Sequence, residues 1–283
     1  MDIKVEKKYD FYRVDQFLSE QLGQSRSIIQ KQIKQGAILL NGKRIKPSYL
    51  IQENDVFVVS NETVVLQKQL YTGDIACLYE DESIVVLNKP IHLVVHTDLP
   101  HQDSLCDYLQ RKHMLNSSVD SRFGIVHRLD KMTEGVMVVA KNQQAMEALK
   151  DQFKSRSVQK KYYAVVKGNL LRDVYHINRP ISRHATKRHL YRVDPNGKEA
   201  ITTVTVLKRF NTKTLCDITI KTGRTHQIRV HLSEMGYPIV GDVEYGRSKL
   251  TDGQHLQAYF LSFKHPTQGK QISFEIPLSD RLK

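Results

Sequence analysis

The apolar residues of this chain fall mainly into short runs of strand length, and segments with helical periodicity interrupt those runs irregularly. The strand-like runs cover residues 75–79, 84–87, 136–140, 162–166, 203–207 and 215–220. Strands and helices do not alternate strictly, as they would in a parallel βαβ fold. The pattern therefore predicts an α+β fold class with a largely antiparallel sheet.

Local signals mark turns and helix ends in this strand-rich part of the chain. Residues 80–83, Glu-Asp-Glu-Ser, are expected to turn the first two strand-like runs into a hairpin. Ser104 and Asp107 fit a capping box that opens a short helix, and Asn142 is placed to cap another. Residues 225–234 are predicted to form a helix, because a glycine and a proline follow shortly after them.

Residues 11–60 have the pattern of a small unit of their own. Apolar side chains recur at helical spacing over residues 14–22, and Gly23 is expected to end that helix. Ser25 is placed to cap a second helix that ends at Gly36. The unit is therefore predicted to begin with two short helices.

A hairpin is expected after the second helix. Asn41-Gly42 lies between the short runs 37–40 and 43–45, and Asn-Gly in that setting is a strong signal for a tight β-turn. Residues 56–59 then close the unit as a strand.

The predicted second helix and hairpin expose basic side chains, which are candidates for contact with RNA: Arg26, Lys31, Lys34, Lys43 and Arg44. Two helices followed by a basic hairpin resemble the S4 RNA-binding domain. That family's signature ends in Gly-Asp, and here Asn54 stands in place of the glycine. Because Asn tolerates left-handed backbone angles, the departure is mild. An unspecialised α+β unit is the alternative interpretation.

Three parts are predicted along the chain: an S4-like domain at 11–60, a polar linker at 61–73 and a larger domain at 74–283. Forty-three Lys and Arg against 30 Asp and Glu give a net charge of +13. Residues 154–213 alone hold 15 basic and 3 acidic residues, so this segment carries a net +12. Clustered cations with interleaved tyrosines indicate a nucleic-acid surface, and a solvated basic face is the plainer alternative.

Several classes of protein are not supported by the sequence. The chain has no apolar run long enough to span a membrane and no secretory signal pattern. Its three cysteines are far apart and unpaired in spacing, which fits a reducing cytoplasm and neither a zinc site nor a disulfide framework. Nucleotide-binding glycine loops and the motifs of zinc proteases and serine hydrolases are missing.

Two segments carry the chemistry that remains. In residues 124–135, Gly-Ile-Val-His-Arg-Leu-Asp-Lys-Met-Thr-Glu-Gly, a charged tetrad follows an apolar run, which puts Asp130 in a loop at a strand end. On this segment alone, an Asp that caps a turn would be the simpler interpretation. Residues 223–232, Gly-Arg-Thr-His-Gln-Ile-Arg-Val-His-Leu, can present backbone N–H groups and guanidinium to anions, or form an ordinary capped helix.

Together these segments resemble the RluA-type RNA pseudouridine synthases. The first resembles the His-Arg-Leu-Asp-x-x-Thr-Ser-Gly signature, and the second resembles the third motif of the family. Residues 160–168 are similar to the family's tyrosine motif, and Asn88-Lys89-Pro90 is similar to the start of its catalytic domain. The resemblance covers residues 75–280, and an N-terminal S4 domain is common in the same family.

The resemblance implies that the chain isomerises uridine to pseudouridine in RNA without a cofactor or a metal. It implies three catalytic residues: Asp130 as nucleophile or base, Tyr162 stacked on the target base with aid to removal of the C5 proton as a second role, and Arg229 paired with Asp130, for which a bidentate geometry is expected. Arg128 resembles the residue that fills the stack left by the extruded base, and binding to a phosphate is the alternative. Further contacts with RNA are expected from His127, Thr133 and Arg224. Ribosomal RNA is favoured over transfer RNA, and the enzyme is expected to be a cytoplasmic monomer.

Two residues depart from the family pattern. Glu134 stands where the family usually has Ser, and His92 stands where it usually has Gly. An added negative charge near Asp130 could alter the choice of substrate or weaken activity. Two alternatives follow: an S4-type RNA-binding protein with a decayed synthase domain, and a glycosidase that pairs Asp130 with Glu134. The intact Asp130, Tyr162 and Arg229 favour the synthase.

Overall fold

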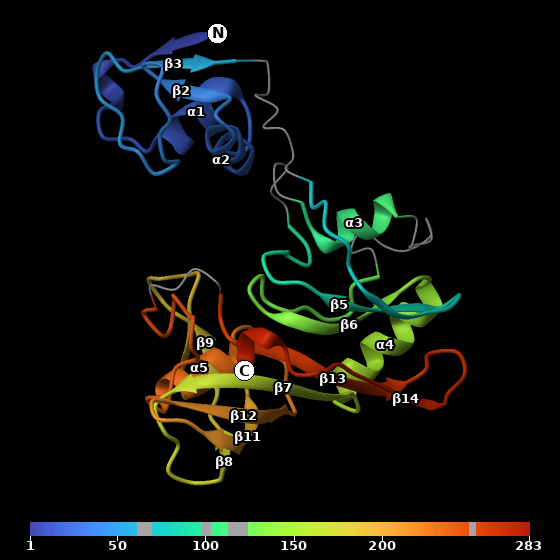
Figure 1. The fold of residues 1–283 in the computed structure, drawn as a ribbon. Coiled ribbons are helices and arrows are strands. Elements are labelled where there is room, and N and C mark those ends of the chain that lie inside the picture. Colours follow the sequence, from blue (N-terminus) through green and yellow to red (C-terminus); the bar gives the residue numbers. More distant parts are fainter. Residues whose placement is uncertain (61–69, 98–102, 113–123, 249–252) are drawn as a thin grey trace. The chain divides into compact units, whose positions relative to one another are not determined.

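The computed structural model describes residues 1–60, 70–97, 103–112, 124–248 and 253–283, and Figure 1 draws its ribbon. These residues group into two compact units, one within Met1–Leu70 and the other within Tyr71–Lys283. Residues 61–69 of the predicted linker lie outside the described residues. In the parts of the chain that the structure describes, no helix is long and apolar enough to cross a membrane.

The first unit packs two helices against a three-stranded antiparallel sheet. Its elements are β1 (Asp2–Lys4), the 3-10 helix η1 (Lys7–Tyr9), α1 (Val14–Leu22), α2 (Arg26–Gln35), β2 (Ile38–Leu40) and β3 (Val56–Val59). The sheet order is β1-β3-β2. Both helices were expected, and both end at a glycine in the left-handed conformation, Gly23 and Gly36. Phe17, Ile29 and Phe57 are fully buried between the helices and the sheet.

The predicted hairpin of this unit is wrong in its second arm. Asn41 and Gly42 do form a turn with positive φ at both residues, but residues 43–45 make only one isolated bridge, from Lys43 to Leu40. β2 pairs with β3 instead. The reason is burial: β3 places Phe57 and Val59 in the core, whereas the segment after the turn is mostly basic and has little apolar surface to bury.

The second unit is built on a nine-stranded sheet. Its strands are β4 (Cys77–Glu80), β5 (Ile84–Lys89), β6 (Glu134–Ala140), β7 (Gln159–Lys167), β8 (Val174–Asn178), β11 (Ile201–Arg209), β12 (Lys213–Ile220), β13 (Leu256–Lys264) and β14 (Gln271–Glu275). They lie in the order β4-β5-β6-β13-β7-β12-β11-β8, with β14 beside β13. Only β6 and β13 pair in parallel among these strands, so the predicted α+β class with a largely antiparallel sheet is confirmed.

Helices cover both faces of this sheet, together with a small ribbon of β9 (Ile181–Arg183) and β10 (Tyr191–Val193). Along β6, Val136 and Val138 pack into the cluster beneath α4 (Gln143–Ser155), while Met137 and Val139 pack into the cluster beneath α5 (Gln227–Glu234). Alternate side chains point to opposite faces of a strand, so α4 and α5 lie on opposite sides of the sheet.

The expected helix signals of this unit are confirmed, with one shift. Ser104 and Asp107 form the capping box of α3 (Leu105–Arg111), and the Asn142 side chain caps α4. α5 begins at Gln227, two residues later than expected, because His226 takes a left-handed conformation with φ 57°.

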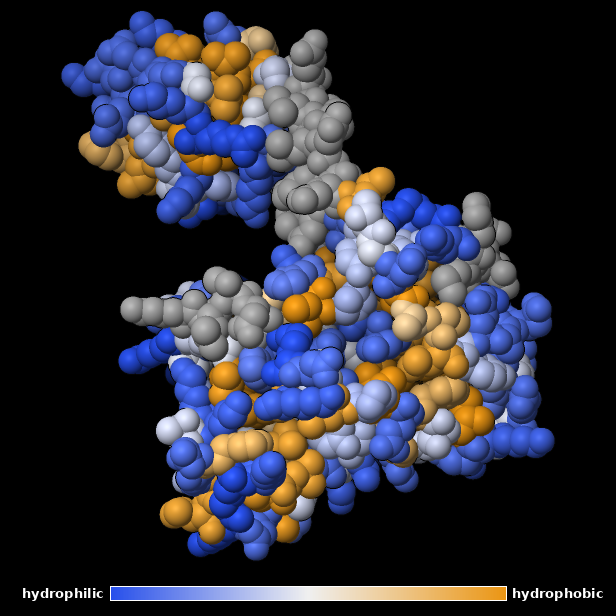
Figure 2. Space-filling model, viewed as in Figure 1, coloured by the Kyte–Doolittle hydropathy of each residue, from blue (hydrophilic) through white to orange (hydrophobic). Residues whose placement is uncertain are grey.

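On the face shown in Figure 2, hydrophilic residues surround scattered apolar patches.

Candidate active site

Asp130 lies in the loop that turns back into β6, at the edge where β6 meets β13. Gly135 lets the start of β6 lie close to β13, because a Cβ at this position would be 2.1 Å from the Ala258 carbonyl oxygen of β13. Asp130 shares a cavity of about 80 Å³ with Tyr162 of β7 and Arg229 of α5. Three residues far apart in the sequence are thus brought to one place.

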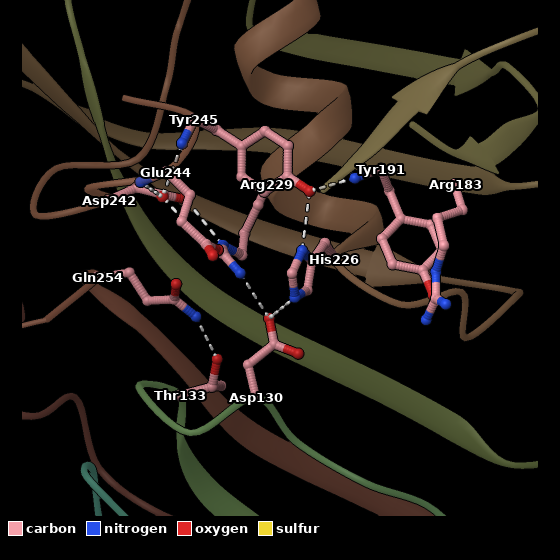
Figure 3. A network of polar contacts seen from close by, with 10 residues as sticks. All are labelled: Asp130, Thr133, Arg183, Tyr191, His226, Arg229, Asp242, Glu244, Tyr245 and Gln254. Carbon is pink, nitrogen blue, oxygen red and sulfur yellow. Dashed lines mark hydrogen bonds and ion pairs between the residues drawn. The ribbon is translucent and has the colours of Figure 1, made fainter. Parts of the chain in front are cut away.

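Arg229 contacts three carboxylates of this site (Figure 3). Its buried guanidinium donates to both carboxylate oxygens of Asp242, at 2.8 and 3.0 Å. It also donates through Nη1 to Asp130 Oδ2 at 3.1 Å and through Nη2 to Glu244 at 2.5 Å. The bidentate pair expected between Arg229 and Asp130 is therefore wrong. Asp242 takes the bidentate position, and Asp130 accepts a single hydrogen bond from Nη1.

Asp242 holds the guanidinium in a fixed orientation. The carboxylate is fully buried, and its Oδ1 also accepts the backbone N–H groups of Glu244 and Tyr245 at 3.0 Å. Burial alone would raise the pKa of Asp242, but the hydrogen bonds and charge of Arg229 outweigh it and lower that pKa. The Arg229 pKa is raised, because its three carboxylate partners outweigh burial. Both groups are therefore charged, and Asp130 is held against a rigid cation.

His226 contacts Asp130 from the other side and was missed as a site residue. Its Nε2 lies 3.8 Å from Asp130 Oδ2, and its Nδ1 lies 2.8 Å from Tyr245 Oη. Tyr245 Oη in turn accepts the backbone N–H of Tyr191 at 2.8 Å. Burial and Arg229 lower the His226 pKa against the opposing effect of Asp130, so the imidazole is neutral at pH 7. The left-handed backbone of His226 is strained for a non-glycine residue and places the ring here.

Tyr162 lines the same cavity as Asp130 and Arg229. Its side chain is buried, and burial, with the charge of Asp130, raises its pKa well above the ordinary value. Tyr162 is therefore a neutral phenol at physiological pH. Its ring supplies an apolar face next to the carboxylate, which suits a planar base.

Lys89 ties the Asp130 loop to the loop after β5. Its fully buried ammonium donates to the carbonyl oxygens of Pro90, Leu93 and Lys131, at 2.6, 2.9 and 3.4 Å. Burial lowers the Lys89 pKa to about 7, although Asp130 and Glu134 oppose that shift. Because Lys131 adjoins Asp130, Lys89 fixes the backbone of the loop that carries the carboxylate.

Glu134, the acidic departure from the family pattern, has a cationic partner. Arg281, near the C-terminus in the 3-10 helix η2 (Asp280–Leu282), donates to its carboxylate at 2.9 Å. The two side chains are 18% and 22% exposed. The charge of Glu134 is thus compensated within the protein.

The other candidate RNA contacts of this unit divide into two kinds. Arg128 and Arg224 line the cavity at Asp130. Thr133 is buried and its hydroxyl accepts from Gln254 Nε2 at 2.6 Å. His127 stacks on Phe153, and its Nε2 accepts the Val138 N–H at 3.1 Å. These last two residues therefore have contacts that hold the fold.

The basic candidates of the first unit are exposed as a group: Arg26, Lys31, Lys34, Lys43 and Arg44. Arg26 donates to the buried Asp15 at 3.1 Å, and Arg44 places its guanidinium over Gly36. A Cβ at Gly36 would lie 3.1 Å from Arg44, so this glycine leaves room for the arginine. Among the described residues of both units, no cluster of His, Cys, Asp and Glu is arranged to hold a metal ion.

Comparisons with known proteins identify both units. A family model described as RNA pseudouridylate synthase matches residues 83–234, and the S4 domain model matches residues 13–57. The chain is 39% identical over 289 residues to an uncharacterized RNA pseudouridine synthase, YlyB, of Bacillus subtilis, covering 100% of this chain and 95% of that protein. It is 35% identical to the ribosomal large subunit pseudouridine synthase D of Vibrio cholerae, covering 95% and 89%. The structure named Human RNA Pseudouridylate Synthase Domain Containing 1 aligns with a TM-score of 0.62 and 26% identity, over 76% of this chain and 89% of that one.

Proposed function

Because the chain belongs to the RNA pseudouridine synthase family and acts as an isomerase on RNA, we propose that Asp130 is its catalytic carboxylate. The observation that carries this proposal is the hydrogen bond from the buried Arg229 to Asp130 inside a cavity walled by Tyr162. Arg229 is fixed by Asp242 on its other edge, so it orients a carboxylate that faces the cavity. Orientation of this kind lowers the barrier of a reaction without a cofactor.

The reaction moves the sugar from N1 to C5 of the same base. The N1–C1′ bond breaks, a C5–C1′ bond forms, C5 loses its hydrogen as a proton, and N1 gains one. Asp130 starts this exchange either by attacking C1′ or by taking a proton from the sugar. Both routes need a well-oriented carboxylate, and the Asp242–Arg229 pair supplies that orientation.

Tyr162 is proposed to stack on the target uracil. Its raised pKa keeps the phenol neutral, which favours a stacking role over removal of the C5 proton by a phenolate. A uridine inside a stem must leave its stack to reach Asp130. The exposed Arg128, two residues before Asp130, is proposed to take the vacated place or to hold a phosphate beside it.

We propose ribosomal RNA of the large subunit as the substrate. The Vibrio cholerae relative carries that substrate in its name, and the exposed basic residues of the S4 unit suit a structured RNA. The division into an RNA-binding domain at 11–60, a linker at 61–73 and a catalytic domain at 74–283 belongs to the same proposal. So does action as a cytoplasmic monomer, which the three free cysteines fit.

The test is release of tritium from RNA labelled at uridine C5, with ribosomal and transfer RNA prepared separately from cells that lack the protein. The wild type should release tritium from ribosomal RNA, and Asp130→Asn should release none while it still binds the RNA. Asp151→Asn makes the same chemical change at an exposed position of α4 and should act as the wild type. Release from transfer RNA alone would overturn the substrate, and near-normal turnover by Asp130→Asn would overturn the role of that residue.

A further inference from the structure

A second cavity lies beside the catalytic one and contains only positive charge. Its volume is about 400 Å³, and it shares Tyr162, Gly223 and Arg224 with the cavity at Asp130. Its charged lining residues are Arg128, Lys154, Arg156, Lys160, Lys221 and Arg224. No Asp or Glu lines it among the residues that the structure describes. We refer to this cavity as the Lys160 pocket.

Lys160 connects this pocket to the catalytic residues. It precedes Tyr162 by two positions on β7, so both side chains leave the same face of the strand. Its ammonium lies 5.9 Å from the centre of the Phe153 ring. A Cβ at Gly223 would lie 3.6 Å from the ammonium, an ordinary contact distance, so this glycine borders the space around Lys160.

Within the described residues, the Lys160 ammonium makes no ion pair or hydrogen bond with the protein. Its neighbour Arg156, by contrast, pairs with Glu199 at 2.6 Å, and Arg224 donates to the Glu199 carbonyl oxygen at 2.9 Å. Burial, together with repulsion from Arg156, lowers the Lys160 pKa to about 8. A partly buried ammonium without a counterion is unfavourable, and an anion that enters with the substrate relieves that cost.

We propose that the Lys160 pocket binds one backbone phosphate of the RNA, next to the uridine held at Asp130, with Lys160 as its principal ligand. This inference rests on the proposed function, because the target uridine sets the position of the neighbouring phosphates. A nucleotide drawn into the catalytic cavity carries its two flanking phosphates with it, and the Lys160 pocket adjoins that cavity with six cationic side chains and, among the described residues, no carboxylate in its lining. Phosphate contacts of this kind fix the register of a nucleic acid without reading its bases.

The variant that tests the proposal is Lys160→Met, which keeps the length of the side chain and removes its charge. Lys161→Met is the matched control: it lies on the opposite face of β7, with its ammonium 5.4 Å from the Phe260 ring. Lys160→Arg restores the charge. Binding to the unmodified ribosomal RNA is measured from low to high salt, and tritium release is measured in a single turnover at saturating RNA.

Lys160→Met should weaken binding by about 10- to 100-fold, as expected for loss of one charge-assisted hydrogen bond. The slope of log affinity against log salt should fall by about 0.7 to 0.9, which corresponds to one phosphate contact. Single-turnover release should stay within about threefold of the wild type. Lys160→Arg should recover most of the affinity, and Lys161→Met should retain the wild-type slope.

The pH dependence gives a readout that a merely structural lysine would not produce. Wild-type affinity, relative to Lys160→Met, should be greatest below pH 8 and should fall as the pH rises above it, because only the charged amine attracts phosphate. His127 faces the same pocket with a pKa lowered to about 3 by burial and by Lys160, so it stays neutral over this range. The other charged groups facing Lys160 are Arg128, Lys154, Arg156, Lys221 and Arg224.

An equal salt slope for Lys160→Met and Lys161→Met would overturn the proposal. If that result came with thermal protection by inorganic phosphate in the wild type but not in Lys160→Met, the pocket would be a site for small anions instead. Failure of the proposed function is a separate result. In that case the wild type itself would release no tritium, whatever the salt slopes show.

Discussion

Replacing Arg229 by lysine separates the charge of this residue from its geometry. Arg229→Lys keeps a cation near Asp242, so it avoids leaving a fully buried carboxylate unpaired, which would cost about 3–5 kcal/mol. The guanidinium donates four hydrogen bonds that spread from Nε, Nη1 and Nη2 to three carboxylates. A lysine has three donors at a single point, so it cannot hold both oxygens of Asp242 and still reach Asp130.

Two magnitudes follow from this geometry. Loss of one charge-assisted hydrogen bond should lower the free energy of unfolding by about 1.5–3 kcal/mol. Loss of the orienting contact to Asp130 should lower the single-turnover rate by about 100- to 1,000-fold, comparable to removal of one preorganised donor from an active site. The rate effect, about 3–4 kcal/mol, is thus expected to equal or exceed the stability effect.

Urea unfolding measures the first quantity, and single-turnover tritium release at saturating RNA measures the second. Arg192→Lys is the control, because Arg192 makes an exposed ion pair with Asp194 at 3.1 Å and surface pairs contribute little. A folded Arg229→Lys variant that works within threefold of the wild-type rate would refute the orienting role. A rate loss accompanied by unchanged RNA affinity would agree with it.

Two further predictions concern His127 in the Asp130 motif and the exposed lysines of α2. The folded-state pKa of His127 is lowered from 6.5 to about 3, so its stabilising contribution is complete above pH 6.5 and is lost by about 1.4 kcal/mol per pH unit as the pH falls towards 3. His127→Gln should therefore lose less stability than the wild type between pH 7 and pH 5 in urea titrations, and an identical loss would contradict the neutral buried imidazole. The combined variant Lys31→Ala and Lys34→Ala on α2 should reduce the salt slope of RNA binding by about 1.4–1.8 without changing the rate at saturating RNA, and an unchanged slope would exclude α2 from the RNA surface.

Local sequence signals predicted the parts of the fold that depend on local chemistry. The caps at Ser104 and Asn142 and the hairpin between β4 and β5 depend on residues within a few positions of each other, and all three are confirmed. β13 was missed although it is central to the sheet. Gln257 and Ser262 interrupt its apolar run in the sequence, yet both side chains are buried in the fold.

The motifs identified residues of the candidate site, but they did not show which of these side chains contact one another. Asp130, Tyr162 and Arg229 each lie in a recognisable motif, and they line one cavity. The motifs did not identify Asp242 as the bidentate partner of Arg229. The two side chains meet only because the chain folds back after α5. His226 belongs to the same motif as Arg229. Its left-handed backbone conformation, which places the ring beside Asp130, cannot be recognised from the sequence.

The surroundings of His92 and Glu134 show how the chain accommodates its two departures from the family pattern. His92 adopts a φ of 65°, which explains why a glycine is usual there, and its side chain is exposed, so the residue fits without displacing its neighbours. Glu134 is paired with Arg281, a residue 147 positions away, so its carboxylate is held by an internal cation. That pairing also removes Glu134 as a free second carboxylate for a glycosidase. Neither departure alters the contacts between Arg229 and Asp130, and the idea of a decayed synthase domain loses the two observations that supported it.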